Sequence, residues 1–325
     1  MINDTSGSQS SGPTIANVPS NESAVAQRIG FVGLGRMGSA MAANLAAAKF
    51  GVVGFVRQAG EMDRLVKLGI SPTLNMADLF DCDIVISMLP DDAAVCSVVF
   101  GPEGLARGMK PGAIHLSMST IGTDAASSAA KEHARHAQGY VAAPVFGNPD
   151  AAKNSQLFVI AAGAAADVAR CRPLLEKLGQ RIFTIGDDPA HANLIKLFGN
   201  MMTATTLEML GETIAALRRR GIAPQLFVDI LTNTMFAGRT HKIYGNRIVH
   251  QDYAPGLAMP LALKDVRLAL AEAEKAGAPM PSVKVVRDRM MEGIARGHAD
   301  LDWSGLGLIA DEDASAARIQ APAIL

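Results

Sequence analysis

A glycine-rich stretch directly after the first apolar run constrains the fold of this chain more than any other feature. The sequence reads RIGFVGLGRMGSAM from Arg28, so Gly33, Gly35 and Gly38 have the spacing G-x-G-x-x-G. A predicted strand precedes the motif and a predicted helix follows it, which is the context of a dinucleotide-binding turn. There the first glycine allows a tight turn, the second lets a pyrophosphate approach the helix amino terminus, and the third lets helix and strand pack closely. An ordinary turn with structural glycines is the alternative.

The region from 28 to 189 alternates β-rich and helical runs. Several of the β-rich runs are continuously apolar, as expected for strands buried on both faces of a parallel sheet. Helical stretches such as SAMAANLAAAKF and DAASSAAKEHARHA separate them. The alternation predicts an α/β fold, a Rossmann-type doubly wound sheet that binds a dinucleotide. The predicted strands are RIGFV, VVGFVR, DIVISML, GAIHLSM, GYVAAPV, LFVIAAG and RIFTIG.

The strand pattern disappears after Pro189, and residues 190–305 are predicted to form an all-α carboxyl-terminal domain for substrate binding and dimerisation. The stretch from 190 to 220 contains no proline and ends before Gly221, which predicts one long helix. Shorter helices are predicted at 224–238, 240–251, 260–277 and 281–297.

Two tails are expected outside these domains. Residues 1–27 are rich in Ser, Asn and Gly and contain no apolar run, so they predict a disordered tail and not a signal peptide. Residues 306–325 are acidic and then alanine-rich, and they predict a flexible tail.

Lys196 stands alone in the apolar run HANLIKLFGNMM, on the predicted long helix. Asn193, Lys196, Asn200 and Thr203 are three or four residues apart and therefore share one helix face. Such a stripe is often the wet face of a surface helix. Here the stripe has one basic residue, Lys196, with the amides of Asn193 and Asn200 on either side. A lysine in a partly dry cleft has a lowered pKa, which suits proton transfer near neutral pH. The pattern favours a functional site. The apolar positions expected to be buried are Leu194, Ile195, Phe198, Met201 and Met202.

Arg57 indicates which dinucleotide would bind. NAD enzymes carry an acid at the end of the second strand, about 20 residues after the glycines, to bind the ribose 2′-hydroxyl. Here that strand ends GFVRQAGEM, with no acid before Glu61. Arg57 is positioned to meet a 2′-phosphate, with Gln58 as a neighbouring donor. The sequence predicts NADP, with NAD as the alternative, and an ordinary surface charge is the alternative role for Arg57.

Composition argues against several other classes of protein. The 325 residues carry a formal net charge of −1 with both signs interspersed, unlike a nucleic-acid binder. No apolar stretch is long enough to suggest a membrane span. Cys82, Cys96 and Cys171 cannot all pair with one another and show no metal-ligand spacing, so no metal is predicted. Each lies in an apolar stretch, so they are expected to be small core residues, which fits a cytoplasmic location.

Four motifs in order, GFVGLGRMGSAMAANL, SMSTIG, AAPVFGNPDAA and IKLFGNMM, are followed by KDVRLAL. In this order they resemble the β-hydroxyacid dehydrogenase family, which includes 3-hydroxyisobutyrate dehydrogenases and glyoxylate/succinic semialdehyde reductases. The resemblance covers residues 28–305. It implies hydride transfer between NADP(H) and a small-molecule substrate, either a β-hydroxyacid or an aldehyde or keto acid. It also implies a homodimer formed through the helical domain.

The resemblance also implies roles for individual residues. Lys196 would donate or accept the proton, and Asn200 would position the substrate and that lysine. Substrate-binding residues would be Ser119, Thr120, Val145, Phe146 and Gly147. Cofactor-binding residues would be Gly33, Leu34, Gly35, Arg36, Met37, Gly38, Arg57, Leu89, Pro90, Ser119 and Lys264. A helix cap in SMST and a surface pair of Lys264 with Asp265 are the milder alternatives.

The substrate loop departs from the family pattern. Relatives commonly read DAPVSGG, whereas this chain has Ala142, Phe146 and Asn148 at the Asp, Ser and second Gly. Residue 199 is Gly where many relatives have a second Asn. Phe146 removes a hydroxyl donor and adds apolar bulk, so the substrate pocket is expected to differ from that of the relatives.

Two other functions remain open from the sequence. Imine reductases resemble this family in fold and cofactor, and Phe146 would suit such a side activity. Many of them, however, have an acid or a tyrosine where Lys196 stands. A catalytically silent dinucleotide-binding module is the second alternative, although such proteins tend to lack the lysine.

Overall fold

The computed structural model describes residues 28–320, so the tail predicted over residues 1–27 lies outside the described residues. The amino-terminal part is built on a six-stranded parallel sheet with the order β3-β2-β1-β4-β5-β6. Chain order reverses between β1 and β4, and ligands of such sheets bind outside the carboxyl ends of the strands at this switch point. The strands are β1 Arg28–Val32, β2 Gly51–Phe55, β3 Ser71–Thr73, β4 Ile84–Ser87, β5 Ile114–Ser117 and β6 Gly139–Ala142.

The sheet is doubly wound as predicted, because helices pack against the apolar strands on both of its faces. Four of its predicted strands form at β1, β2, β4 and β5, and a fifth at β6. The three-residue strand β3 was not predicted, because Ser71 and Pro72 carry no β pattern. The helices of this part are α1 Arg36–Ala47, α2 Met62–Val66, α3 Asp92–Phe100, α4 Leu105–Gly108, α5 Thr123–Arg135, α6 Pro149–Lys153 and α7 Ala165–Leu178, with 3₁₀ turns η1 Ala59–Glu61 and η2 Met76–Leu79.

The last predicted strands form a separate three-stranded sheet, β7-β8-β9. Strand β7 (Val145–Phe146) runs antiparallel to β8 (Leu157–Ala161), and β9 (Gly179–Thr184) runs parallel to β8. The predicted run GYVAAPV is therefore divided between two sheets, because the chain turns at Ala143–Pro144. A bridge between Ala142 and Ala162 joins the two sheets.

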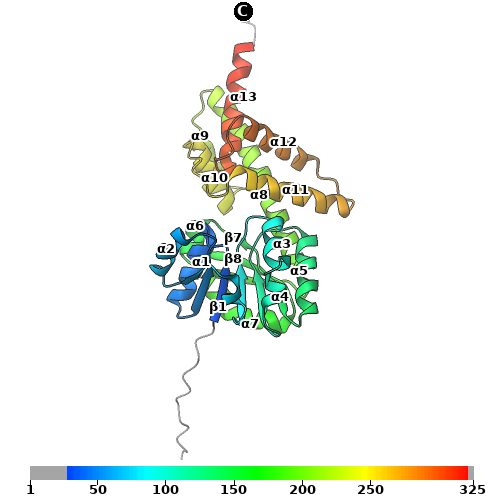
Figure 1. Ribbon diagram of the computed structural model, residues 1–325. Helices are drawn as coiled ribbons and strands as arrows, with labels where there is room; N and C mark the ends of the chain where they lie inside the picture. The colour runs from blue at the N-terminus through cyan, green and yellow to red at the C-terminus, as the bar shows by residue number, and fades with distance from the viewer. Residues whose placement is uncertain (1–27, 321–325) are drawn as a thin grey trace, which may run out of the picture.

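The carboxyl-terminal part is all α-helical, as predicted, and helix α8 (Pro189–Arg219) leads into it from the α/β part (Figure 1). Asp188 caps α8 by accepting a hydrogen bond from Ala190 N–H, and Pro189 fills the first helical position, where no N–H is needed. Gly221 ends the helix with a φ of +71°. The other helices are α9 Pro224–Thr232, α10 Arg239–Val249, α11 Met259–Lys275, α12 Pro281–Ala295 and α13 Leu306–Gln320, with the 3₁₀ turn η3 Trp303–Gly305.

The flexible tail predicted from residue 306 is wrong where the structure describes it, because α13 packs along α8. Leu306 and Ile309 are fully buried in the core of the helical part. The acidic residues that suggested a tail pair with arginines of other helices: Asp311 with Arg218, and Asp313 with Arg289 and Arg296. Residues 321–325 lie outside the described residues.

Helix α8 differs from its predicted orientation at two apolar positions. The polar Asn193, Lys196 and Asn200 are buried, whereas Ile195 and Met202, expected in the core, are 46% and 65% exposed. The cause is tertiary packing: α8 packs against α5 and α11, and Asn200 donates a hydrogen bond to Asp265 of α11. The polar stripe is therefore an interior feature of the molecule and not a wet face.

Candidate active site

The glycine turn between β1 and α1 has the shape that the motif predicts. Gly33 has a φ of +91°, and a Cβ there would lie 2.3 Å from the carbonyl oxygen of Met88, just beyond β4. A Cβ at Gly38 would lie 2.0 Å from the carbonyl oxygen of Gly33. A Cβ at Gly35, in contrast, would meet nothing within 4 Å. Two glycines thus close the turn while the middle one leaves open space at the amino terminus of α1, which fits a pyrophosphate.

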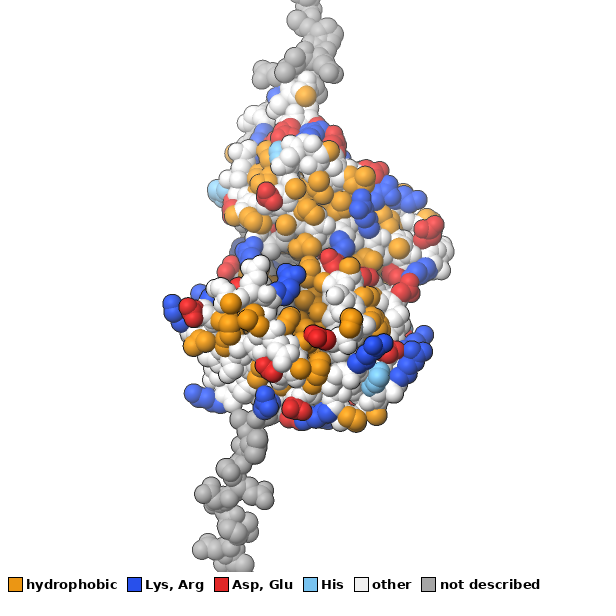
Figure 2. Space-filling view, viewed as in Figure 1, with side chains coloured by type: hydrophobic (Ala, Val, Ile, Leu, Met, Phe, Trp, Pro, Cys, Tyr) orange, Lys and Arg blue, Asp and Glu red, His pale blue; other side chains and the backbone are white. Residues whose placement is uncertain are grey.

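The residues between these glycines divide into core and surface. Leu34 is buried in the core of the α/β part, and Met37 packs against it. Arg36 is exposed and donates a hydrogen bond from Nη1 to the carbonyl oxygen of Pro255 in the helical part. Figure 2 shows an indentation where the two parts meet on this face.

A second arginine that the sequence analysis missed also reaches the turn. Arg64 on α2 donates from Nη2 to the carbonyl oxygen of Leu34 at 3.1 Å, while Arg57 is exposed just beyond β2. Arg64 lies 30 residues after Leu34, so no motif connects the two.

The loops after β4 and β5 meet beside the glycine turn and are tied to helix α11. Leu89 N–H donates to Ser119 Oγ at 2.8 Å. The ammonium of Lys264 donates to the carbonyl oxygens of Pro90, at 3.0 Å, and Thr120. The structure therefore brings together five of the predicted site residues, which come from three separate segments of the sequence.

Lys196 lies at the start of a buried hydrogen-bonded chain that links α8 to α11. Its Nζ donates to Asn200 Oδ1 at 2.8 Å, and Asn200 Nδ2 donates to Asp265 Oδ2 at 2.6 Å. The second carboxylate oxygen of Asp265 forms an ion pair with Lys264 at 3.0 Å. Lys196 is only 7% exposed. Asp265, noted in the sequence only as a neighbour of Lys264, thus joins both lysines into one cluster.

Burial sets the charge state of Lys196. Removal from water disfavours the ammonium, while the Asp265 carboxylate favours it and the Lys264 ammonium opposes it. Together they lower the pKa of Lys196 to about 8. Near neutral pH the group can therefore both donate and accept a proton.

Asn193, a further polar residue of the stripe, anchors the start of α8. Its Oδ1 accepts a hydrogen bond from Ile121 N–H at 3.4 Å, in the SMSTIG loop, while its Nδ2 is buried without a partner among the described residues. A hydrogen bond thus links the SMSTIG loop, which contains Ser119, to the start of α8.

The predicted substrate loop lies against α8 through Phe146. The ring centroid of Phe146 is 4.4 Å from Lys196 Nζ. Val145 is buried in the core of the α/β part, so its side chain does not face Lys196. Gly147 has a φ of +145°, and Asn148 caps α6 by accepting a hydrogen bond from Ala151 N–H at 2.9 Å. Of this loop, the ring of Phe146 is what the structure brings to the lysine.

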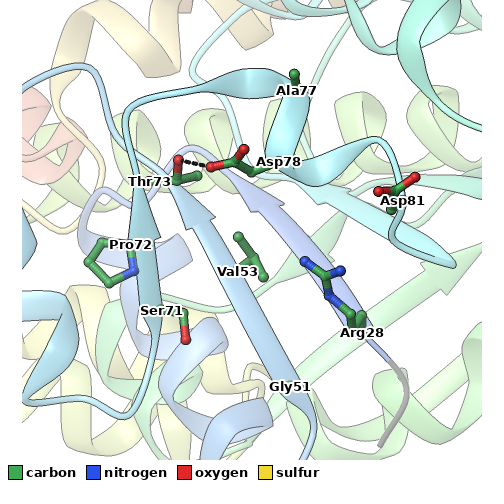
Figure 3. A pocket seen from close by; sticks show the side chains of 9 residues that line it. All are labelled: Arg28, Gly51, Val53, Ser71, Pro72, Thr73, Ala77, Asp78 and Asp81. Carbon is green, nitrogen blue, oxygen red and sulfur yellow. Dashed lines mark hydrogen bonds between the residues drawn. The ribbon is translucent and has the colours of Figure 1, made fainter. Parts of the chain in front are cut away.

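A surface pocket of about 580 Å³ lies elsewhere, over the β1–β3 side of the sheet (Figure 3). Its polar residues include Arg28, Asp81 and Asp78, which accepts a hydrogen bond from Thr73. None of the predicted site residues lines it.

Within residues 28–320 no group of three or more His, Cys, Asp or Glu could hold a metal ion. No helix of that range has both the length and the apolar character of a membrane span.

Comparisons with known proteins agree with this architecture. Residues 28–186 match the family described as the NAD binding domain of 6-phosphogluconate dehydrogenase. Residues 190–307 match the family described as NAD-binding of NADP-dependent 3-hydroxyisobutyrate dehydrogenase. A crystal structure of 3-hydroxyisobutyrate dehydrogenase from Salmonella typhimurium has the same fold, with a TM-score of 0.79 at 23% identity over 87% of this chain and 99% of that one.

Two relatives are similar over nearly their whole length. The uncharacterized oxidoreductase YfjR of Bacillus subtilis (strain 168) is 36% identical over 282 residues, which cover 86% of this chain and 98% of that protein. Glyoxylate/succinic semialdehyde reductase 1 of Arabidopsis thaliana is 31% identical over 286 residues, covering 86% and 96%. The chain therefore belongs to the β-hydroxyacid dehydrogenase family and is an NAD(P)-dependent oxidoreductase of the hydroxyacid dehydrogenase type.

Proposed function

We propose that this enzyme transfers a hydride between NADP(H) and a small β-hydroxyacid, or the corresponding aldehyde or keto acid, with Lys196 as general acid and base. The observation that carries the proposal is the buried chain from Lys196 through Asn200 to Asp265. Burial and hydrogen bonding of a lysine at a domain junction, beside the predicted cofactor loops, support a role in proton transfer.

The residues of this chain would divide the work as follows. The nicotinamide, when bound, supplies or accepts the hydride. During reduction the Lys196 ammonium donates a proton to the oxygen of the substrate as negative charge develops on it. During oxidation neutral Lys196 takes the hydroxyl proton. General acid–base catalysis of this kind is worth about 10²–10⁴ in rate, and alignment of the substrate in the cleft contributes much of the rest.

Asn200 orients the lysine. Because Asp265 accepts from the amide nitrogen of Asn200, the amide oxygen faces Lys196. That oxygen accepts one of the three ammonium protons, which leaves the others for the substrate. Ser119, whose hydroxyl accepts from Leu89 N–H and keeps its own proton to donate, would hold the acid group of the substrate.

We infer NADP as the preferred cofactor from the basic side chains near the glycine turn. Arg57 is exposed beyond β2, where an NAD enzyme places an acid, and Arg64 reaches the carbonyl of Leu34. Guanidinium groups suit a 2′-phosphate because they donate several hydrogen bonds in one plane.

We further propose a homodimer formed through the outer face of α8. Ile195, Met202 and Met209 are spaced seven residues apart and are 46%, 65% and 62% exposed. An apolar stripe of this kind, continued by Leu226 and Ile230 on α9, suits burial against a second copy. Light scattering at micromolar concentration should give the dimer mass, and a monomer mass would contradict the proposal.

The free thiols Cys82, Cys96 and Cys171 fit a cytoplasmic location, which stays a prediction.

The proposed reaction is tested by following NADPH and NADH oxidation with glyoxylate, succinic semialdehyde, methylmalonate semialdehyde and a cyclic imine. We expect turnover of at least one aldehyde acid, faster with NADPH. Turnover of the imine alone would favour an imine reductase. Tight NADPH binding without any turnover would favour the silent dinucleotide-binding module, and either result would overturn the proposed reaction.

A further inference from the structure

Two of the departures from the family pattern, Phe146 and Gly199, lie against one another. A Cβ at Gly199 would lie 2.3 Å from Cζ and 2.7 Å from Cε1 of the Phe146 ring, well inside van der Waals contact. The ring therefore occupies the space that any side chain at residue 199 would need. The two positions lie 53 residues apart (199 − 146) on a strand and a helix, so only the fold joins them.

The backbone of Phe146 is held by contacts on both sides. Phe146 is paired with Phe158 in the antiparallel contact of β7 with β8. The next residue, Gly147, has a φ of +145°, and a Cβ there would lie 2.6 Å from Leu157 Cδ2. With its backbone held on both sides, the ring is aimed at α8, and a side chain at residue 199 would have to turn it aside.

The ring also stands beside the proposed proton-transfer group. It lies 4.4 Å from Lys196 Nζ, three residues before Gly199 on the same helix. Phe146 offers no hydrogen-bonding atom, and the amide oxygen of neighbouring Asn148 is engaged at the amino terminus of α6. The polar partner of the ammonium, Asn200, lies on α8 and not on this loop. One side of the space around Lys196 is therefore apolar.

We propose that Phe146 and Gly199 form an apolar wall of the substrate pocket, which selects hydroxyacids carrying an alkyl group next to the reacting carbon over those carrying a hydroxyl there. The inference rests on the proposed function, since it places the substrate at Lys196. A hydroxyl against the ring loses its water without gaining a partner. A methyl or ethyl group gains contact with the ring.

The closest matched substrates are 3-hydroxyisobutyrate and glycerate, which share the carboxylate and primary alcohol and differ by methyl against hydroxyl at carbon 2. We expect kcat/KM with NADP⁺ to be higher for 3-hydroxyisobutyrate by about tenfold or more, which is the discrimination that one small group gives in an apolar pocket. Phe146→Ser should reduce the preference to within about threefold, and Phe146→Leu, which stays apolar, should keep it. An unchanged preference for 3-hydroxyisobutyrate over glycerate in a folded Phe146→Ser enzyme would refute the proposed apolar wall.

A double-mutant cycle tests whether the two residues act as a pair. Gly199→Ala should lower kcat/KM for 3-hydroxyisobutyrate by about tenfold in the wild-type background, because the ring is displaced. In the Phe146→Ser background the same change should cost about twofold or less, because no ring remains to be displaced. Equal losses in the two backgrounds would show that the positions are independent and would overturn the pairing.

Calorimetry separates failure of the wall from failure of the proposed reaction. Both acids are titrated into wild-type and Phe146→Ser enzyme saturated with NADP⁺. Tighter binding of 3-hydroxyisobutyrate that depends on Phe146, without turnover of either acid, would support the wall and refute the proposed reaction. Equal or absent binding of both acids would overturn the wall whether or not the enzyme turns over other substrates.

Discussion

The amide nitrogen of Asn200 on α8 lies 2.6 Å from Oδ2 of Asp265 on α11, and this contact determines which end of the amide faces Lys196. The catalytic lysine proposed here is therefore oriented by a carboxylate that it does not touch. Asp265 also raises the pKa of Lys196 by its charge, against the effect of burial.

The first prediction concerns Asp265→Asn. Loss of the carboxylate should move the pKa of Lys196 below about 8, because the charge that favours the ammonium is gone. The descending limb of the pH profile for reduction should shift to lower pH, and kcat should fall by about tenfold to a hundredfold through misalignment. Asp124→Asn, which removes an exposed carboxylate paired with Lys275, is the control. An unshifted profile would show that Asp265 does not act on Lys196.

The second prediction contrasts two glycines of the turn. Gly38→Ala should destabilise the protein by about 1–3 kcal/mol, because its Cβ would overlap the carbonyl of Gly33. Gly35→Ala should leave the melting temperature unchanged, since its Cβ meets no protein atom within 4 Å, yet should weaken NADPH binding. Thermal denaturation and fluorescence titration measure the two effects. Full NADPH affinity in Gly35→Ala would refute a pyrophosphate at this turn.

The third prediction concerns cofactor choice. Arg57→Ala should lose about tenfold or more in NADPH affinity, because a hydrogen bond to a charged group is worth about 1.5–3 kcal/mol. NADH affinity should not change. The exposed Arg107, on α4, provides the control substitution. Equal loss for both cofactors, or none for either, would show that Arg57 does not read the 2′-phosphate.

The fourth prediction tests the packing of α13. Leu306→Ala should lower the free energy of unfolding by about 2–5 kcal/mol, because Leu306 is fully buried against the helical core. Val285→Ala, at a position that is 55% exposed, should change it far less. Urea unfolding of both variants gives the comparison. Similar small effects would mean that α13 contributes little to the core.

Local patterns predicted much of this molecule. The spacing of Gly33, Gly35 and Gly38 placed a turn whose geometry the structure confirms, and proline and glycine marked the two ends of α8. These signals are readable because the interactions behind them act within one or two turns of the chain.

What the sequence could not predict depends on contacts between distant segments. Asp265 meets Asn200 across 65 residues, and Arg64 meets Leu34 across 30. The periodicity of α8 showed two faces but not which one points inward, because that depends on α5 and α11. Residues 306–325 resembled a tail because the acids Asp311 and Asp313 look solvated in the sequence. In the structure Arg218 pairs with Asp311, and Arg289 and Arg296 pair with Asp313.

The central claim, that Lys196 transfers the proton, is tested most directly by the pH dependence of kcat in both directions. Reduction should be fastest below pH 8 and decline as the pH rises through about 8, because the ammonium is the acid. Oxidation should rise through the same range, because the neutral amine is the base. Lys196→Ala should lower kcat by about 10²-fold or more while NADPH binding is kept. A variant that keeps turnover within about tenfold, or one that loses cofactor binding to the same extent as turnover, would contradict the account.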